Sequence, residues 1–436
     1  MTESTDSFTG GLLAFLRRSP TPYHAVANMV ERLAAAGFER LAERDSWDLR
    51  PGGRYLVTRN GSSLVAFVIG HGDPASGGLR LVGAHTDSPG LRLKPRPEVR
   101  RHGYLQLGVE VYGGALLNPW FDRDLSIAGR VSYVEGDERL RHALIDFEDP
   151  VAVIPSLAIH LDREVNDHRT INAQKDLPPV VMRAPAGGEP VFHDIVLRRL
   201  RVTHPGAARV LDFELSLYDC QPPALAGLER EFLTGARLDN LLSCYAGMES
   251  IAGASGARHC VLVCNDHEEV GSLSAPGAQG PFLRSVLRRI AGSAETLDRA
   301  MAASMLVSAD NAHGIHPNFA DRHDEQHGPV LNAGPVIKIN ASQRYASTSE
   351  TAALFRQLCE HADVPVQSFV NRADLACGST IGPITSAEIG VRTLDVGVAS
   401  FAMHSIREMT GARDPEYLFR ALSAFYALED LPEPPR

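Results

Sequence analysis

Residues able to bind a metal ion follow three strongly apolar runs of the chain. The run LRLVGA leads into His85 and Asp87, the run CVLVCND is followed after one residue by Glu268 and Glu269, and the run MLVSA leads into Asp310. Short apolar runs of this kind predict buried strands. In an open parallel sheet, ligands bind outside the carboxyl ends of the strands. We therefore expect these three strand ends to lie close together.

Two further residues complete a candidate metal site. Asp239 lies in GARLDNLL at the start of a predicted helix, and His404 lies in ASFAMHSIRE. The full set has two histidines and three carboxylates: His85, Asp239, Glu269, Asp310 and His404. Two zinc ions about 3.5–4 Å apart need a bridging carboxylate and terminal His and carboxylate ligands. The set gives each ion three protein ligands if Asp239 is shared. A donor set without thiolate suits Zn²⁺ and would also accept Mn²⁺ or Co²⁺.

The neighbours of these ligands suggest supporting roles. Asp87 stands two residues after His85, so on an extended segment both side chains face the same way. Asp87 could then hydrogen-bond the far ring nitrogen of His85 and fix its orientation. Of Glu268 and Glu269, one would bind metal while the other takes a proton from the activated water. The residues alone do not say which.

Each of these residues also has an ordinary interpretation. Asp239 could be a helix N-cap and Asp310 part of a turn, since such roles are common for Asp after a strand. His404 alone would be a partly buried histidine, and Glu268 with Glu269 a solvated pair. What favours a metal site is that three separate strand ends carry such residues.

The elements that must position these residues alternate in the second half of the chain. The pattern predicts helices at 236–252, 281–291, 348–361 and 415–428 and strands at 259–264, 305–309, 335–340 and 391–396. Such alternation predicts an α/β fold with a mostly parallel sheet sandwiched by helices. Between about 95 and 223 the runs are strand-like, including 191–196. We therefore predict a discontinuous catalytic domain, 1–94 and 235–436, interrupted by a β-rich domain at 95–234.

Composition excludes some partners. The 436 residues carry a net charge of −10, which repels nucleic acid and anionic membranes. No run approaches the roughly 20 apolar residues of a membrane span, and the N-terminus lacks the basic segment of a secretory signal. These features predict a cytoplasmic protein. If its substrate is acidic, the binding pocket must supply a local positive charge.

Longer motifs resemble a known family. HTDSPGLRLKP at 85–95, RLDNLLSCYAG at 237–247 and EEVGSLSAPGAQGPFL at 268–283 are similar to motifs of the M18 metallopeptidases, the aspartyl aminopeptidases. So are residues 308–347 and MHSIREMTGARD at 403–414. The resemblance implies a zinc aminopeptidase fold with an inserted dimerisation domain, and dimers assembled into a dodecamer. It also implies removal of N-terminal Asp, and more weakly Glu, from peptides.

The resemblance further implies residue roles. His85, Asp239 and Asp310 would bind one zinc, and Asp239, Glu269 and His404 the other. Glu268 would be the general base and Asp87 the acid that orients His85. The implied substrate contacts are His313, Lys338, Tyr345 and His160, the last acting on the active site of a neighbouring subunit. Lys338 would supply the positive charge for an acidic substrate.

Three other histidines and one neighbour of the Glu pair fall outside these roles. His316, His323 and His327 lack carboxylates at ligand spacing, so we expect structural or subunit-contact roles for them. His267 could change the pKa of the neighbouring base or contact solvent, and we expect the solvent contact. Two alternatives to the acidic-residue enzyme remain. One is a two-zinc aminopeptidase or amide hydrolase of other specificity, and the other is a non-catalytic peptide-binding scaffold, which predicts a broken ligand set.

Overall fold

The protein divides into two compact units. The computed structural model describes residues 2–136, 138–184 and 192–433. An α/β unit comprises Met1–Asp87, Pro223–Met403 and Glu408–Arg436, and a β unit comprises Ser88–Pro222 with His404–Arg407. The units change at 87/88 and 222/223, whereas the sequence placed boundaries at 94/95 and 234/235. The differences arise because β5 (Gly90–Arg101) pairs inside the β unit, while β11 and β12 (Ala224–Ala226 and Phe232–Gly235) pair inside the α/β unit.

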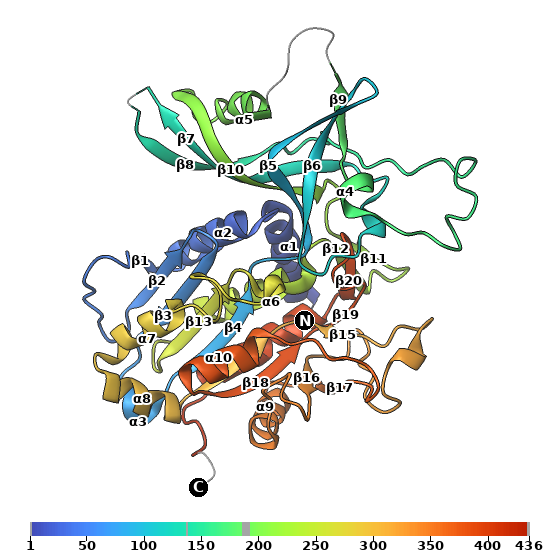
Figure 1. Ribbon diagram of the computed structural model, residues 1–436. Helices are drawn as coiled ribbons and strands as arrows, with labels where there is room; N and C mark the ends of the chain where they lie inside the picture. The colour runs from blue at the N-terminus through green and yellow to red at the C-terminus, as the bar shows by residue number, and fades with distance from the viewer. Residues whose placement is uncertain (1, 137, 185–191, 434–436) are drawn as a thin grey trace. The chain divides into compact units, whose positions relative to one another are not determined.

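A nine-stranded sheet forms the centre of the α/β unit (Figure 1). Its order is β1-β2-β3-β13-β4-β14-β18-β16-β17. The strands are β1 Glu39–Arg40, β2 Arg54–Arg59, β3 Ser63–Val68, β13 Cys260–Asn265, β4 Arg80–His85, β14 Met305–Ala309, β18 Arg392–Gly397, β16 Val336–Ile339 and β17 Gln367–Val370. Five of its eight strand pairs are parallel, including β13–β4, β4–β14 and β14–β18. The sheet is therefore mostly parallel, as the sequence predicted.

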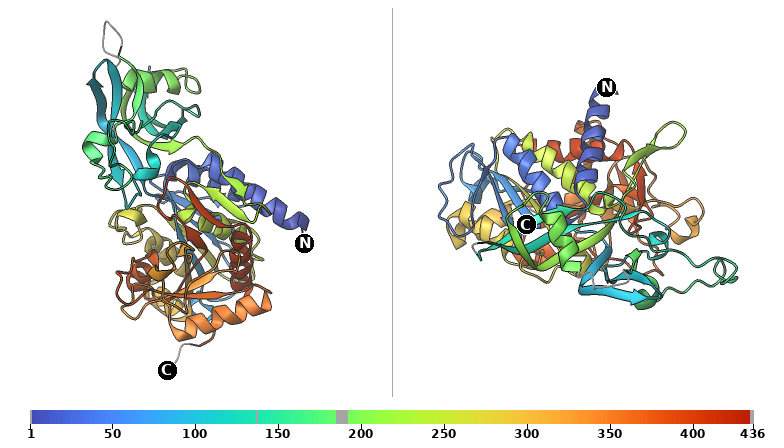
Figure 2. Two further views of the ribbon diagram at one scale, coloured as in Figure 1. Left: turned by 90° about the vertical axis from the view of Figure 1, so that its right-hand side faces the viewer. Right: turned by 90° about the horizontal axis from the view of Figure 1, so that it is seen from above.

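Helices cover both faces of this sheet. On one face lie α1 Thr2–Arg18, α2 Pro22–Ala35, α6 Leu238–Ala252, α9 Ser349–His361 and α11 Asp414–Ala427. Several of them contact one another, and Figure 2 shows α1 and α2 in blue in two further views. On the other face lie α7 Phe282–Ala291, α8 Ala294–Ala303 and α10 Ile381–Ile389, with the short α3 Pro74–Gly77 against α8.

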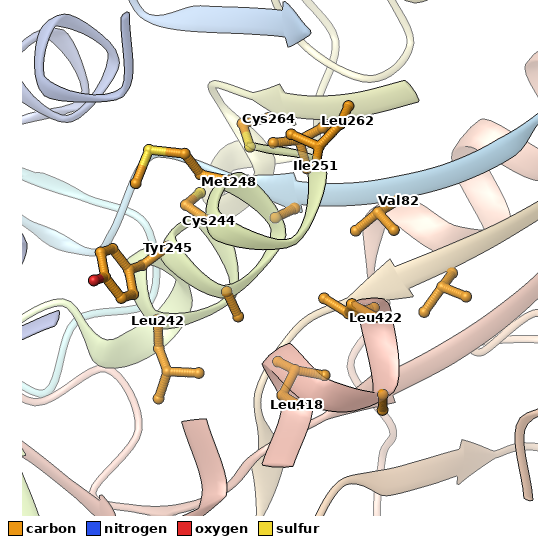
Figure 3. Packing of buried hydrophobic residues seen from close by; sticks show 14 of the residues in the cluster. Val82, Leu242, Cys244, Tyr245, Met248, Ile251, Leu262, Cys264, Leu418 and Leu422 are labelled. Carbon is orange, nitrogen blue, oxygen red and sulfur yellow. The ribbon is translucent and has the colours of Figure 1, made fainter. Parts of the chain in front are cut away.

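The alternation of side chains along β13 shows how the two cores arise. Cys260, Leu262 and Cys264 point into the first helical layer, while Val261 and Val263 belong to the second core. Successive residues of a strand face opposite sides, so a continuous apolar run supplies both layers. Figure 3 shows α6 residues such as Leu242 and Met248 in the first core. Each such buried side chain contributes about 1.5–3 kcal/mol of stability.

A second sheet of the α/β unit is small. Its order is β11-β12-β20-β19-β15, with β20 at Glu408–Gly411, β19 at Ala399–Phe401 and β15 at Ala312–His313. β15 begins two residues after Asp310 and runs parallel to β19. This sheet therefore continues the chain away from the carboxyl end of β14.

The β unit is an antiparallel sheet with one longer helix. The order is β8-β7-β10-β5-β6-β9, from β6 Tyr104–Tyr112, β7 Leu125–Glu135, β8 Leu140–Asp146, β9 Val180–Arg183 and β10 Ala207–Asp219. It also contains the short α4 Ala173–Asp176. The strand expected at 191–196 is wrong: residues from Phe192 form α5, Phe192–Leu200. Phe192, Val196 and Leu200 are buried at a spacing of four, which is helical periodicity.

In the part of the chain that the structure describes, no helix has both the length and the apolar character of a membrane span.

Candidate active site

Three neighbouring parallel strands bring the predicted ligands to one edge of the sheet. β4 lies between β13 and β14, with His85 opposite Asn265 and Gly83 opposite Ser308. The carboxyl ends of the three strands are therefore level. His85 ends β4, the Glu268–Glu269 pair follows β13, and Asp310 follows β14.

His85 lies at the centre of this edge. Its Nε2 atom is 3.6 Å from Asp239 Oδ1, 3.5 Å from Asp310 Oδ1 and 4.0 Å from Glu268 Oε2. On the other side of the ring, Nδ1 is 3.0 Å from the carbonyl oxygen of Asp87 and 3.5 Å from its Oδ1. With Nδ1 donating to Asp87, Nε2 faces the carboxylates with its lone pair, as a metal-binding imidazole does.

Asp87 has a second task that the sequence did not reveal. Its Oδ1 and Oδ2 accept the backbone N–H groups of Glu268 and Glu269, both at 3.1 Å. The carboxylate, which has no exposed surface, therefore joins the segment after β4 to the segment after β13. The parallel register of two neighbouring strands is the feature that could have indicated this contact.

Asp239 is placed by contacts around the start of α6 rather than by a helix cap. Its backbone is not helical, and its N–H donates to Glu408 Oε2 at 2.9 Å. The next residue, Asn240, donates from Nδ2 to the carbonyl of Ala309 at 2.7 Å, which ties α6 to the end of β14. The N-cap interpretation of Asp239 is therefore wrong. The buried Glu408 was not predicted, and no pattern in the sequence singles it out.

The donor set fits a divalent cation. One ligand atom each of His85, Asp239 and Glu269 lies within 4.8 Å of the others. The neighbouring carboxylates of Asp87, Asp310 and Glu268 add negative charge in a largely buried place. Burial raises the pKa of Glu268 to about 8, with the negative Asp310 and Glu269 adding to the shift and His85 opposing it. Such a concentration of buried carboxylates calls for positive charge, and imidazole with carboxylate suits zinc.

Lys338 provides part of that positive charge. The Lys338 side chain is 2% exposed, and its Nζ donates to Asp310 Oδ2 and to the carbonyl of Asn311, both at 3.1 Å. The Nζ atom also lies 5.1 Å from the ring centre of the buried Tyr345. Although burial alone would raise it, the pKa of Asp310 is held below its usual range by Lys338 and His85. Lys338 thus contacts a predicted metal ligand, and its role as a substrate contact stays a prediction.

The other predicted residues are described within their own units. His404 belongs to the β unit, where its Nδ1 is 3.2 Å from the carbonyl oxygen of Gly114. His160 is exposed, also in the β unit. The proposed roles of both at the metal centre stay predictions. In the α/β unit, exposed His313 packs edge-on against Phe369 with ring centres 5.8 Å apart.

His267 does not simply contact solvent. Its ring is 2.8 Å from Ser274 Oγ and 3.3 Å from the buried Asp266 carboxylate. The residue is partly buried beside the Glu pair and stabilises the turn that carries it.

Carboxylates and an imidazole that converge at the carboxyl edge of a mostly parallel sheet are the arrangement of a metal-dependent hydrolase. Comparison with known proteins defines the family. The family described as aminopeptidase I zinc metalloprotease (M18) matches residues 15–426. A relative named probable M18 family aminopeptidase 2, from Pseudomonas aeruginosa strain LESB58, is 57% identical over 97% of this chain and 98% of its own length.

Solved structures agree. The cryo-EM structure of the Ape4 and Nbr1 complex contains a chain that matches with a TM-score of 0.94 at 39% identity, over 98% of this chain and 86% of that one. The S. cerevesiae mApe1 dodecamer matches with a TM-score of 0.84 at 29% identity, over 98% of this chain and 97% of that one. The chain belongs to the M18 family of zinc metalloproteases and is an aminopeptidase of that family.

Proposed function

We propose that this aminopeptidase removes acidic residues, Asp and more weakly Glu, from peptide N-termini with two zinc ions per subunit. The observation that carries the proposal is the convergence of Asp239, Asp310 and Glu268 on the Nε2 face of His85. His85, Asp239 and Asp310 would bind one zinc, and Asp239, Glu269 and His404 the other. Mn²⁺ or Co²⁺ could substitute for zinc in the same donor set.

The proposed chemistry divides between the metal and the chain. Bound zinc supplies Lewis acidity and a water of lowered pKa. Glu268 takes a proton from the attacking water and returns it to the leaving amine. The bond from its N–H to Asp87 fixes the turn that carries it.

Acidic specificity requires a cation near the substrate. Lys338 is the candidate that the family resemblance provides, together with Tyr345, His313 and His160. The buried contact between Lys338 and Asp310 supports a place beside the metal centre. The acidic balance of the chain, −10 overall, makes such a local cation necessary for an acidic side chain.

We further propose that the protein works in the cytoplasm as a homododecamer built from dimers, with the catalytic role in the α/β unit and dimerisation in the β unit. Support comes from the structural likeness to the mApe1 dodecamer. Sedimentation of the purified protein tests the assembly: a single species near twelve times 47.2 kDa is expected, and a stable monomer would contradict it.

An activity panel tests the specificity. Peptides that differ only in the first residue (Asp, Glu, Asn, Leu or Ala) are incubated with purified protein, with a chelator, and with zinc added back. The proposal expects the highest kcat/KM for Asp, a smaller value for Glu, loss with chelator and recovery with zinc. Equal or higher values for Leu would support an aminopeptidase of other specificity, and no hydrolysis of any peptide would support a peptide-binding scaffold.

A further inference from the structure

A hollow lined by basic side chains lies in the α/β unit, with part of its wall in the chain segment that follows Asp310. Its volume is about 310 Å³, and it is lined by residues of 313–323, 369–376 and 400–403. The lining includes two arginines and three histidines, namely Arg322, Arg372, His313, His316 and His323. None of the described residues that line it is Asp or Glu. In a chain with a net charge of −10, such a place is suited to an anionic group.

The hollow adjoins the metal centre through the backbone. His313, in its wall, comes three residues after Asp310 on β15, and β15 pairs with β19, whose residues Ser400 and Phe401 form another part of the wall. Three residues of chain therefore separate the wall of the hollow from Asp310 at the carboxyl end of β14.

The two arginines differ in their availability. Arg372 is engaged: its Nε and one terminal nitrogen donate to Asp374 at 2.7 and 3.0 Å, and its other terminal nitrogen donates to the carbonyl of Asp321. Arg322 lies 4.0 Å from Asp321, with the two side chains exposed at 67% and 76%, and it also interacts electrostatically with Asp374. An exposed pair at this distance contributes little, so the Arg322 guanidinium can serve a ligand.

Two histidines offer hydrogen bonds in the same hollow. His316 Nδ1 accepts the N–H of Asn318 at 3.2 Å, so its Nε2 carries the proton and can donate. His323 Nδ1 is buried and has no hydrogen-bond partner among the residues that the structure describes. A buried polar atom of this kind is costly unless a ligand or water satisfies it. Both rings are therefore suited to an acceptor-rich ligand.

We propose that this hollow is a subsite for a carboxylate of the peptide substrate, with Arg322 as the charge partner and His316 and His323 as hydrogen-bond donors. The inference rests on the proposed function in that it needs a peptide substrate, but it does not need an acidic first residue. It differs from the assignment of Lys338, whose ammonium is already paired with Asp310. The carboxylate belongs to the first residue or to an acidic residue further along the peptide.

Two pairs of peptides distinguish these sources. The first pair differs at the N-terminal residue (Asp against Asn), and the second keeps N-terminal Asp and differs at the second residue (Glu against Gln). The ratio of kcat/KM within each pair is measured for wild type, Arg322→Gln and the control Arg284→Gln. Arg284 is also an exposed arginine, on α7, and lines a different surface hollow, so its variant removes the same charge elsewhere.

In one of the two pairs, Arg322→Gln should reduce the kcat/KM of the charged peptide relative to that of its amide counterpart about tenfold. The change should appear as a higher KM for the charged peptide, because one charge-assisted hydrogen bond is lost. A drop in the first pair identifies the N-terminal side chain as the ligand, and a drop in the second identifies the downstream acid. Three outcomes would overturn the proposed subsite. They are unchanged kcat/KM ratios in both pairs, equal losses of kcat/KM for charged and amide peptides, and the same drop in the Arg284→Gln control. If wild type itself does not favour Asp over Asn, the proposed specificity fails, while the second pair still tests the hollow.

Discussion

The buried ion pair behind the metal centre allows a quantitative prediction. Lys338 Nζ and Asp310 Oδ2 are 3.1 Å apart, and their side chains are 2% and 11% exposed. At an effective dielectric constant of about 20, charges at this distance attract each other by about 5 kcal/mol. Removal of one partner from a buried pair costs about 3–5 kcal/mol, because the other charge stays buried without compensation. Lys338→Met should therefore lower the free energy of unfolding of the metal-free protein by about 3–5 kcal/mol.

Urea denaturation of chelator-treated protein measures this change. The matched control is Arg50→Met, since Arg50 pairs with Asp48 at 2.7 Å but both side chains are about three-quarters exposed, at 77% and 78%. That variant should leave the free energy of unfolding nearly unchanged. A double-mutant cycle with Asp310→Asn isolates the pair, and Asp310→Asn should cost less in the Lys338→Met background. A loss below about 1 kcal/mol for Lys338→Met, or additive losses in the cycle, would refute the reasoning.

Three further predictions follow from the same structure. Glu268→Gln should lower kcat by about 10²–10⁴-fold with zinc content unchanged by elemental analysis, and a kcat near wild type would refute its role as base. Asp87→Asn should weaken zinc binding by about 10–100-fold in a competition titration with a chelator. The reason is that the variant side chain can no longer accept the N–H groups of both Glu268 and Glu269. Unchanged zinc affinity would contradict this role. Burial, with Arg237 adding to the effect, lowers the pKa of His24 from its ordinary 6.5 to about 4, so the folded protein keeps this ring neutral. The neutral ring contributes at most about 3 kcal/mol to the free energy of unfolding, and this contribution is present above pH 6.5 and is lost as the pH falls toward 4. From pH 7 to 4 the free energy of unfolding should therefore decline less steeply in His24→Gln than in wild type. Parallel curves would contradict the assignment.

Much of the fold followed from local patterns. The apolar runs that end at His85, Asn265 and Ala309 became β4, β13 and β14, since continuous apolar runs indicate strands buried on both faces. The strand predicted at 191–196 failed because a short apolar segment fits either period, and only the burial of Val196 and Leu200 at helical spacing decides it.

The site was predictable in its residue types but not in its supporting contacts. The convergence of His85 with Asp310 follows from the rule for parallel strand ends. The bonds from Asp87 to two backbone N–H groups and the contact of Glu408 with Asp239 depend on tertiary register, which no local pattern reveals. Lys338 was expected beside substrate because of the family resemblance, and its observed neighbour is Asp310, at a depth that only packing determines.

The central claim is tested most directly by counting zinc in active protein. Elemental analysis of the purified chain, measured with peptide hydrolysis before and after chelation, should give two zinc ions per subunit at full activity. His85→Ala should lose zinc together with hydrolysis, because Nε2 of this residue faces the converging carboxylates. Full hydrolysis by metal-free protein, or unchanged zinc content in His85→Ala, would contradict the account.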